Sequence, residues 1–127
     1  MAGVDGRVAL VTGAGRGIGR RTAELLAERG AKVMCVARSE PELASLGLDY
    51  AVADVGTEEG CNAAVEQTEK RLGPIEIFVC NHGLGSAHER VIWEQDPDVW
   101  RETMRINLDG PFYLSRRIVG RMVEQRY

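Results

Sequence analysis

Short apolar runs and helical apolar patterns alternate along the chain. Four mainly apolar runs predict buried parallel strands at Arg7–Thr12, Lys32–Ala37, Tyr50–Val52 and Ile75–Cys80. Between and after these runs, apolar residues recur every three or four positions, as they do on one face of a helix. The resulting βαβαβαβα order predicts an α/β fold in which helices cover both faces of a parallel sheet.

Local signals place the ends of the four expected helices. The first has an apolar stripe that starts at Ile18 and continues through Thr22 and Leu25, and it should end at Gly30. A short second helix is expected over Glu40–Leu46, and the third is capped by Thr57 and stopped by Gly73 and Pro74. The fourth is expected over Asp96–Arg126, with apolar residues that include Trp100, Met104 and Leu108 and a kink at Gly110 and Pro111.

Composition and charge narrow the possible classes of function. The 127 residues allow one domain, residues 1–127, and 44% hydrophobic with 28% charged residues is the composition of a folded protein. A net charge of -3 argues against nucleic acid or an anionic membrane surface as a partner, so any bound anion needs a local site. No apolar run approaches the roughly 18 residues of a membrane span, and the N-terminus lacks the apolar stretch of a signal peptide.

The cysteines bear on the cellular compartment. Cys35, Cys61 and Cys80 are odd in number, widely spaced and set within apolar patterns. This arrangement favours buried free thiols in reducing surroundings over a disulfide framework. We therefore expect a cytoplasmic protein.

A glycine-rich turn joins the first predicted strand to the first helix. Glycines in this place allow a tight turn and a close approach of the backbone to a pyrophosphate, whose charge is met by N–H groups at the helix N-terminus. The common G-x-G-x-x-G spacing needs a third glycine at position 18, where this chain has Ile18. The glycines stand instead at Gly13, Gly17 and Gly19, preceded by Thr12. This T-G-x-x-x-G-x-G pattern resembles the short-chain dehydrogenase/reductase family.

The resemblance, which runs from Arg7 onward, implies a Rossmann-type doubly wound sheet. It also implies hydride transfer between a nicotinamide cofactor and a carbonyl or alcohol substrate. In this family a serine, a tyrosine and a lysine four residues after the tyrosine carry most of the chemistry, and an asparagine on the long helix holds a relay water. Asn107 matches that asparagine, but the chain has no Tyr-x-x-x-Lys. The resemblance therefore implies that this chain is the cofactor-binding portion of a reductase, truncated after about four strands and inactive by itself.

The residues after the second predicted strand bear on the choice of cofactor. An acid there binds the ribose 2′-hydroxyl of NAD, whereas an arginine suits the 2′-phosphate of NADP. The chain has Arg38 and Ser39 at this point, and Arg16 in the glycine loop can converge on the same phosphate. Basic residues at these positions accompany NADP preference in the family, so NADP is favoured and NAD is the alternative. Two other interpretations stay open. Arg38 could be a solvated surface charge, and Glu40 could bind a ribose hydroxyl.

The resemblance extends to four more cofactor positions: Asp54, Val55, Asn81 and Gly83. The first stands where the family binds the adenine amino group, and the last two belong to an Asn-Asn-Ala-Gly motif after the fourth strand. Cys80 and His82 depart from this motif. The imidazole replaces a small residue that lets the cofactor come close, and it could donate to a ribose or phosphate oxygen instead. Cys80, His82 and His88 lack the spacing of zinc ligands, so no metal is expected.

Two other functions compete with a reductase. One is a non-catalytic module that binds a nucleotide or a partner. It would form a homo- or hetero-oligomer through the unpaired edge of the fourth strand and the long helix after Asp96. The other is a methyltransferase-type domain, which favours an acid after the second strand, where Arg38 is unsuitable. Titration with NADPH, NADH and S-adenosylmethionine separates these alternatives.

Overall fold

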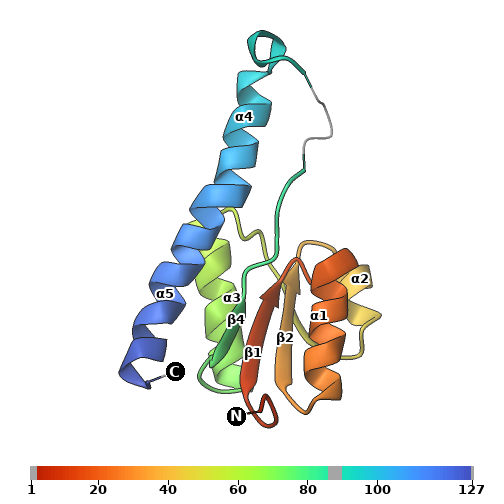
Figure 1. Ribbon diagram of the computed structural model, residues 1–127, viewed down its shortest axis with the longest axis vertical. Helices are drawn as coiled ribbons and strands as arrows, with labels where there is room; N and C mark the ends of the chain where they lie inside the picture. The colour runs from red at the N-terminus through yellow and green to blue at the C-terminus, as the bar shows by residue number, and fades with distance from the viewer. Residues whose placement is uncertain (1–2, 86–89, 127) are drawn as a thin grey trace.

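A computed structural model describes residues 3–85 and 90–126, which are built around one parallel sheet (Figure 1). Its strands are β1 (Val8–Thr12), β2 (Lys32–Ala37), β3 (Asp49–Val52) and β4 (Ile77–Val79), in the spatial order β3-β2-β1-β4. The chain moves outward from β1 to β3 and then returns to place β4 on the other side of β1. The strand order therefore reverses between β1 and β4.

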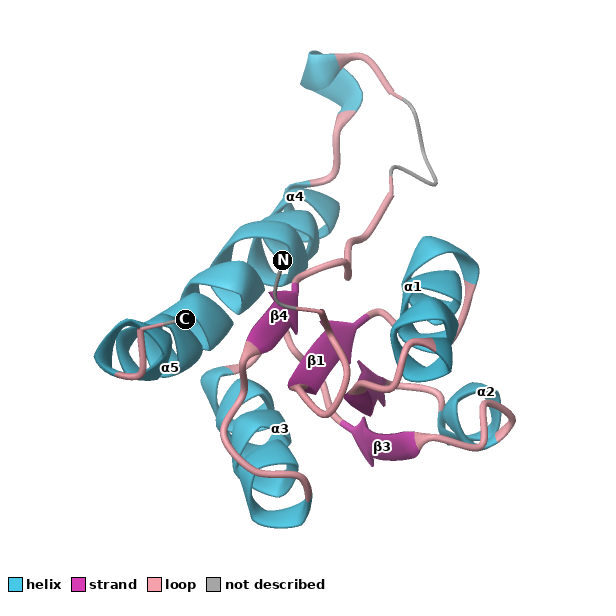
Figure 2. Cartoon of the chain, turned by 60° about the horizontal axis from the view of Figure 1, so that its bottom comes forward, coloured by secondary structure: helices cyan, strands magenta, loops and turns pink. Residues whose placement is uncertain are grey.

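Helices cover both faces of this sheet (Figure 2). α1 (Gly17–Glu28) and α2 (Glu40–Ala44) lie on one face, and α3 (Glu58–Arg71) and α5 (Gly110–Glu124) lie on the other. α4 (Pro97–Met104), a π-helical segment (Arg105–Asp109) and α5 form one continuous helical rod, which follows a 3-10 turn (Ile92–Glu94). This doubly wound α/β arrangement confirms the fold expected from the alternating pattern.

Alternate positions of the strands fill two apolar layers, as expected for a sheet covered on both faces. Leu10 and Met34 pack on the side of α3 and α5, where Leu114 completes the layer. Val11 packs on the opposite side with Leu43 of α2. All five side chains are fully buried. Because a shift of one residue would exchange the two layers, this burial fixes the register of the strands.

The predicted elements are present, and some of them have different bounds: β2 matches, β3 begins one residue earlier, and α2 ends two residues earlier. β4 has three residues instead of the whole Ile75–Cys80 run. The cap at the start of α3 is confirmed, because the Thr57 hydroxyl accepts a hydrogen bond from the Gly60 N–H at 3.0 Å. The long helix is interrupted by the π-helical segment, which ends just before the kink expected at Gly110. The winding of the helix thus changes in the turn before Gly110 and Pro111.

Three side chains of the predicted apolar stripes are exposed. The exposed fractions are 79% for Ile18 and 57% for both Trp100 and Leu108. Ile18 lies in the first turn of α1, at the wall of a pocket beyond the end of the sheet. Trp100 is exposed because α4 extends past the sheet, where no strand lies beneath it (Figure 1). Leu108 lies in the π-helical segment, whose buried residue is Ile106.

The cysteines differ in their surroundings. Cys35 and Cys61 are buried free thiols, as expected, whereas Cys80 is exposed. Cys80 follows the end of β4, an edge strand that pairs only with β1 among the described residues. Within the described ranges, no helix is both long enough and apolar enough to cross a bilayer.

Candidate functional site

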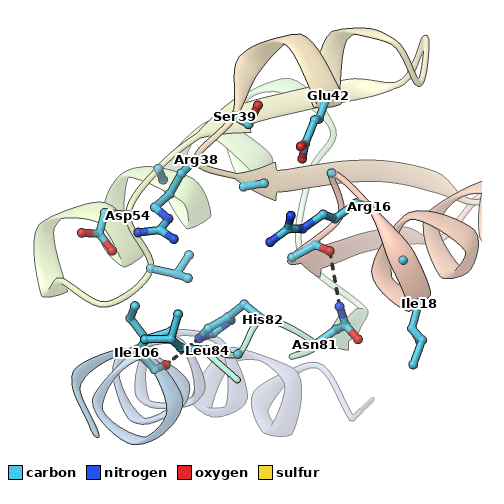
Figure 3. A pocket seen from close by; sticks show the side chains of 17 residues that line it. Arg16, Ile18, Arg38, Ser39, Glu42, Asp54, Asn81, His82, Leu84 and Ile106 are labelled. Atoms are coloured by element: carbon cyan, nitrogen blue, oxygen red, sulfur yellow. Dashed lines mark hydrogen bonds between the residues drawn. The ribbon is translucent and has the colours of Figure 1, made fainter. Parts of the chain in front are cut away.

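A pocket of about 690 Å³ lies at the carboxyl ends of the strands (Figure 3). In open α/β sheets, ligands bind where the strand order reverses, which here is between β1 and β4. All the predicted cofactor residues except Gly19 line this pocket: Gly13, Arg16, Gly17, Ile18, Arg38, Ser39, Asp54, Val55, Asn81 and Gly83. The fold thus brings together residues from four separate segments of the chain.

The glycine loop makes a sharp turn into α1. Gly13 and Gly17 have φ angles of 63° and 61°, in the region that favours glycine. Gly19 is buried, and a methyl group there would collide with the carbonyl of Gly13 and the side-chain amide of Asn81. Gly19 therefore acts behind the pocket, where it lets α1 pack closely against the loop, as the third glycine of a dinucleotide-binding turn does.

The start of α1 is suited to bind an anion. Arg16, the N-cap residue, makes no side-chain capping bond, and the first turn holds no acidic residue. Arg16 and Arg38 point into the pocket from opposite walls (Figure 3). Neither has an ion-pair partner among residues 3–85 and 90–126. Uncapped helix N–H groups and two unpaired guanidinium groups attract phosphate.

The residues after β4 form hydrogen bonds that support the glycine loop. Thr12 is fully buried, and its Oγ1 accepts hydrogen bonds from the backbone N–H groups of Asn81 at 3.1 Å and His82 at 3.3 Å. Asn81 Nδ2 donates to the Gly13 carbonyl at 3.3 Å (Figure 3). Asn81 thus supports the glycine turn in addition to lining the pocket.

His82 links three parts of the fold. Its Nε2 lies 3.0 Å from the Ile106 carbonyl, and its Nδ1 lies 2.8 Å from Thr12 Oγ1. Because a carbonyl oxygen only accepts, Nε2 carries the proton and Nδ1 accepts from the Thr12 hydroxyl. Burial lowers the pKa of His82, and the bond to Ile106 opposes this only in part, so the ring is neutral at pH 7. The suggested donation to a ribose or phosphate oxygen is wrong, since both ring nitrogens are used within the chain.

Asp54, after β3, is held from two sides. Its Oδ1 accepts a hydrogen bond from the Gly56 N–H at 2.9 Å, and its Oδ2 lies 2.9 Å from Nη1 of Arg105. Partial burial raises the pKa of this carboxyl, but the bonds from Gly56 and Arg105 outweigh it and hold the pKa below its usual value. A carboxylate has about four acceptor positions, so Asp54 retains capacity for a ligand.

Asn107 does not line the pocket. Its Oδ1 accepts from the Leu84 N–H at 2.6 Å, and its Nδ2 donates to the Leu84 carbonyl at 3.0 Å. This two-point contact attaches the loop after β4 to the π-helical segment. The contact of Asn107 with a relay water stays a prediction.

Sequence reasoning missed several residues of the pocket wall, among them Glu42, Leu84 and Ile106. The sequence could have indicated Glu42, because the short helix that contains it begins directly after Ser39, a predicted site residue. Glu40 instead accepts a hydrogen bond from the Tyr50 hydroxyl at 3.1 Å and does not line the pocket, so it is not placed to bind a ribose hydroxyl there. Leu84 and Ile106 had no local signal, because their position depends on contacts between distant segments.

A metal centre was not expected, and the described part of the chain contains no group of three or more potential His, Cys, Asp or Glu ligands. Cys80 Sγ and His82 Nδ1 lie 3.9 Å apart. His88 is outside the described residues.

Sequence comparison places the chain among known oxidoreductases. Residues 7–127 match the family described as short chain dehydrogenase. A 3-oxoacyl-(acyl-carrier-protein) reductase of Vibrio cholerae is 35% identical, and the match covers 97% of this chain and 52% of that protein. A short chain dehydrogenase of Pseudocercospora fijiensis is 32% identical, with 97% and 43% covered. The chain spans about half the length of the curated relatives it matches.

Solved structures share the fold. The L-sorbose reductase of Gluconobacter frateurii, complexed with NADPH and L-sorbose, has a TM-score of 0.87 and 30% identity, and the match covers 97% of this chain and 50% of that chain. The gluconate 5-dehydrogenase of Burkholderia cenocepacia, in complex with NADP and tartrate, has a TM-score of 0.83 and 38% identity, with 95% and 50% covered. From the matched sequence and the shared fold together, this chain belongs to the short chain dehydrogenase family.

Proposed function

We propose that this chain binds NADP(H) in the pocket, as the cofactor-binding portion of a short chain dehydrogenase. One observation carries the proposal: the glycine loop, the uncapped start of α1 and the unpaired Arg16 and Arg38 all converge on one pocket. That pocket lies where the strand order reverses. Structures of similar fold are complexed with NADH, NADPH or NADP, which supports a nicotinamide dinucleotide as the ligand here.

The pocket walls suggest how the dinucleotide would lie. The pyrophosphate would meet the glycine loop at Gly13, Gly17 and Ile18, and the adenine would meet Asp54 and Val55. Asn81 and Gly83 would support a cofactor ribose. NADP is favoured over NAD because Arg38 and Ser39, with Arg16 across the pocket, offer donors to a 2′-phosphate where NAD sites place an acid.

The chemistry of the whole protein follows from its family. A bound nicotinamide would supply hydride to a carbonyl or accept it from an alcohol. The residues of this chain would hold and orient the dinucleotide, and Asn107 would contribute to the proton relay. Because the sequence contains no Tyr-x-x-x-Lys, we expect residues 1–127 to bind cofactor without catalysing hydride transfer.

Calorimetric titration of the 127-residue chain tests this proposal. NADPH is expected to bind about tenfold more tightly than NADH, because only NADPH brings a 2′-phosphate to the arginines. S-adenosylmethionine is expected to give no binding heat. Binding of S-adenosylmethionine alone would favour a methyltransferase-type site. Absence of binding by all three compounds would leave a purely structural role.

The outer face of the helical rod favours a second candidate function, which is self-association. From the π-helical segment to the end of α5, four large apolar side chains are each at least 45% exposed: Leu108, Phe112, Val119 and Val123. Their spacings of four, seven and four residues place them on one helix face. Contiguous exposed apolar surface of this kind marks sites of protein contact.

Sedimentation velocity tests self-association. The wild-type chain is expected to form dimers or larger species, and Phe112→Asp is expected to shift it to monomer at the same concentration, because an aspartate would be buried unpaired in the contact. Ile92→Asp is the matched control, since Ile92 is 72% exposed but lies in the 3-10 turn, away from this face. A wild-type chain that stays monomeric and well folded would rule out this function.

A further inference from the structure

Three charged side chains meet at one end of the pocket. Asp54 follows β3, Arg38 follows β2, and Arg105 comes from the π-helical segment, 51 positions after Asp54. Arg105 Nη1 contacts Asp54 Oδ2 at 2.9 Å. The contact joins the end of the sheet to the helical rod. It involves an arginine that does not line the pocket itself.

The position of Arg105 is fixed from its other side. Its Nε and Nη2 donate to the two carboxylate oxygens of Glu102, at 2.9 and 2.7 Å. Such a bidentate pair fixes the plane of the guanidinium group. Gly56 leaves room for that group, since a methyl at this position would collide with it. Arg105 is thus pre-oriented toward Asp54 by residues on both sides.

A second arginine lies near the Asp54 carboxylate. The positive charge of Arg38 also acts on Asp54, because it contributes to the lowered pKa of that carboxyl. Figure 3 shows Arg38 and Asp54 on the same side of the pocket. Yet Asp54 pairs with Arg105, and Arg38 has no ion-pair partner in the described ranges. The pairing of Asp54 with Arg105 thus coincides with an Arg38 guanidinium that has no ion pair in the described part of the chain.

We propose that Arg105 is a positioning residue that keeps Asp54 away from Arg38, so that the Arg38 guanidinium stays free for a phosphate monoester on the adenosine ribose. This role deepens, and rests on, the proposed binding of NADP(H). Arg105 thereby determines the selectivity for NADPH over NADH without touching either dinucleotide. Without Arg105, Asp54 would turn to Arg38 and neutralise it.

The ratio of the dissociation constants of NADH and NADPH measures this selectivity. Arg105→Met is expected to lower the ratio about threefold to tenfold by weakening NADPH alone. Adding Asp54→Asn to that variant removes the charge that captures Arg38, and it is expected to restore the ratio. Arg105→Lys, which keeps the positive charge, is expected to retain most of the wild-type ratio. Arg101→Met is the matched control, because Arg101 pairs with Asp98 on the exposed side of α4.

Carboxyl NMR titration of Asp54 supplies a readout that needs no cofactor. In wild type, Arg38→Ala is expected to raise the pKa of Asp54 slightly. In the Arg105→Met background the same substitution is expected to raise it much more, because Arg38 has by then become the partner of Asp54. Thermal unfolding of each variant checks that it remains folded.

The outcomes separate this inference from the function on which it rests. If wild type prefers NADPH and Arg105→Met leaves the ratio unchanged, the inference is wrong and the proposed function stands. If Arg105→Met lowers the affinity for both dinucleotides equally and Asp54→Asn does not restore it, Arg105 is only a structural support. The inference is wrong in that case too. If wild type binds neither dinucleotide, the proposed function fails and the inference fails with it.

Discussion

Replacing Gly19 with alanine is expected to lower the affinity for NADPH at least about tenfold and to destabilise the fold by about 1–3 kcal/mol. The added methyl would collide with the Gly13 carbonyl and the Asn81 side chain. These neighbours belong to the loop and to its support, so the collision is relieved only if α1 moves away from them. That movement would displace the N–H groups at the start of α1 from the pyrophosphate position.

Chemical denaturation and titration with NADPH measure the two effects separately. Gly120→Ala is the matched control, because it adds the same methyl in α5, where nothing lies within 4 Å. This control is expected to retain its affinity and to gain up to about 1 kcal/mol of stability from helix propensity. Equal affinity of Gly19→Ala and wild type would show that α1 need not approach the loop closely.

Removing the Arg38 guanidinium is expected to have the second large effect. Arg38→Ala should raise the dissociation constant of NADPH about 10- to 100-fold, the range for loss of a charge-assisted contact with a phosphate. NADH, which lacks the 2′-phosphate, should change by less than about twofold. The physical reason is that Arg38 reaches the pocket without an ion-pair partner among the described residues, so its donors are available.

Fluorescence titration with both dinucleotides gives this comparison. Arg116→Ala serves as control, since it removes the same charge from an exposed position on α5 that does not line the pocket. An equal loss of affinity for NADPH and NADH in Arg38→Ala would mean that the side chain contacts a group common to both. No loss for either would identify Arg38 as a solvated surface charge.

The fold could be predicted because its signals are local. Each strand is a short apolar run, and each turn that enters the pocket contains glycine or a capping residue. The glycine spacing after β1 located the pocket, and the residues after β2, β3 and β4 followed from their place in the family pattern. Parallel strands end at the same side of a sheet, so these separate segments had to meet.

The remaining parts of the site depend on contacts that no local pattern encodes. His82 bonds to Ile106, 24 positions away, and Arg105 bonds to Asp54 across 51 positions. The exposure of Trp100 was missed for a related reason, because a helical stripe gives the direction of a side chain but not the length of the sheet beneath it. Pro111 suggested a kink, whereas the interruption lies in the preceding turn.

The π-helical segment contributes one side chain to the pocket and another to the exposed apolar face, so the two proposed binding events can be coupled through it. Ile106 lines the pocket, while Leu108, two residues later, is part of the exposed apolar face of the rod. If dinucleotide binding changes how strongly two copies associate, association must change the dinucleotide affinity by the same factor, because linkage between two binding equilibria is reciprocal. The apparent affinity for NADPH would then vary with protein concentration, and a dilution series would yield the coupling free energy directly.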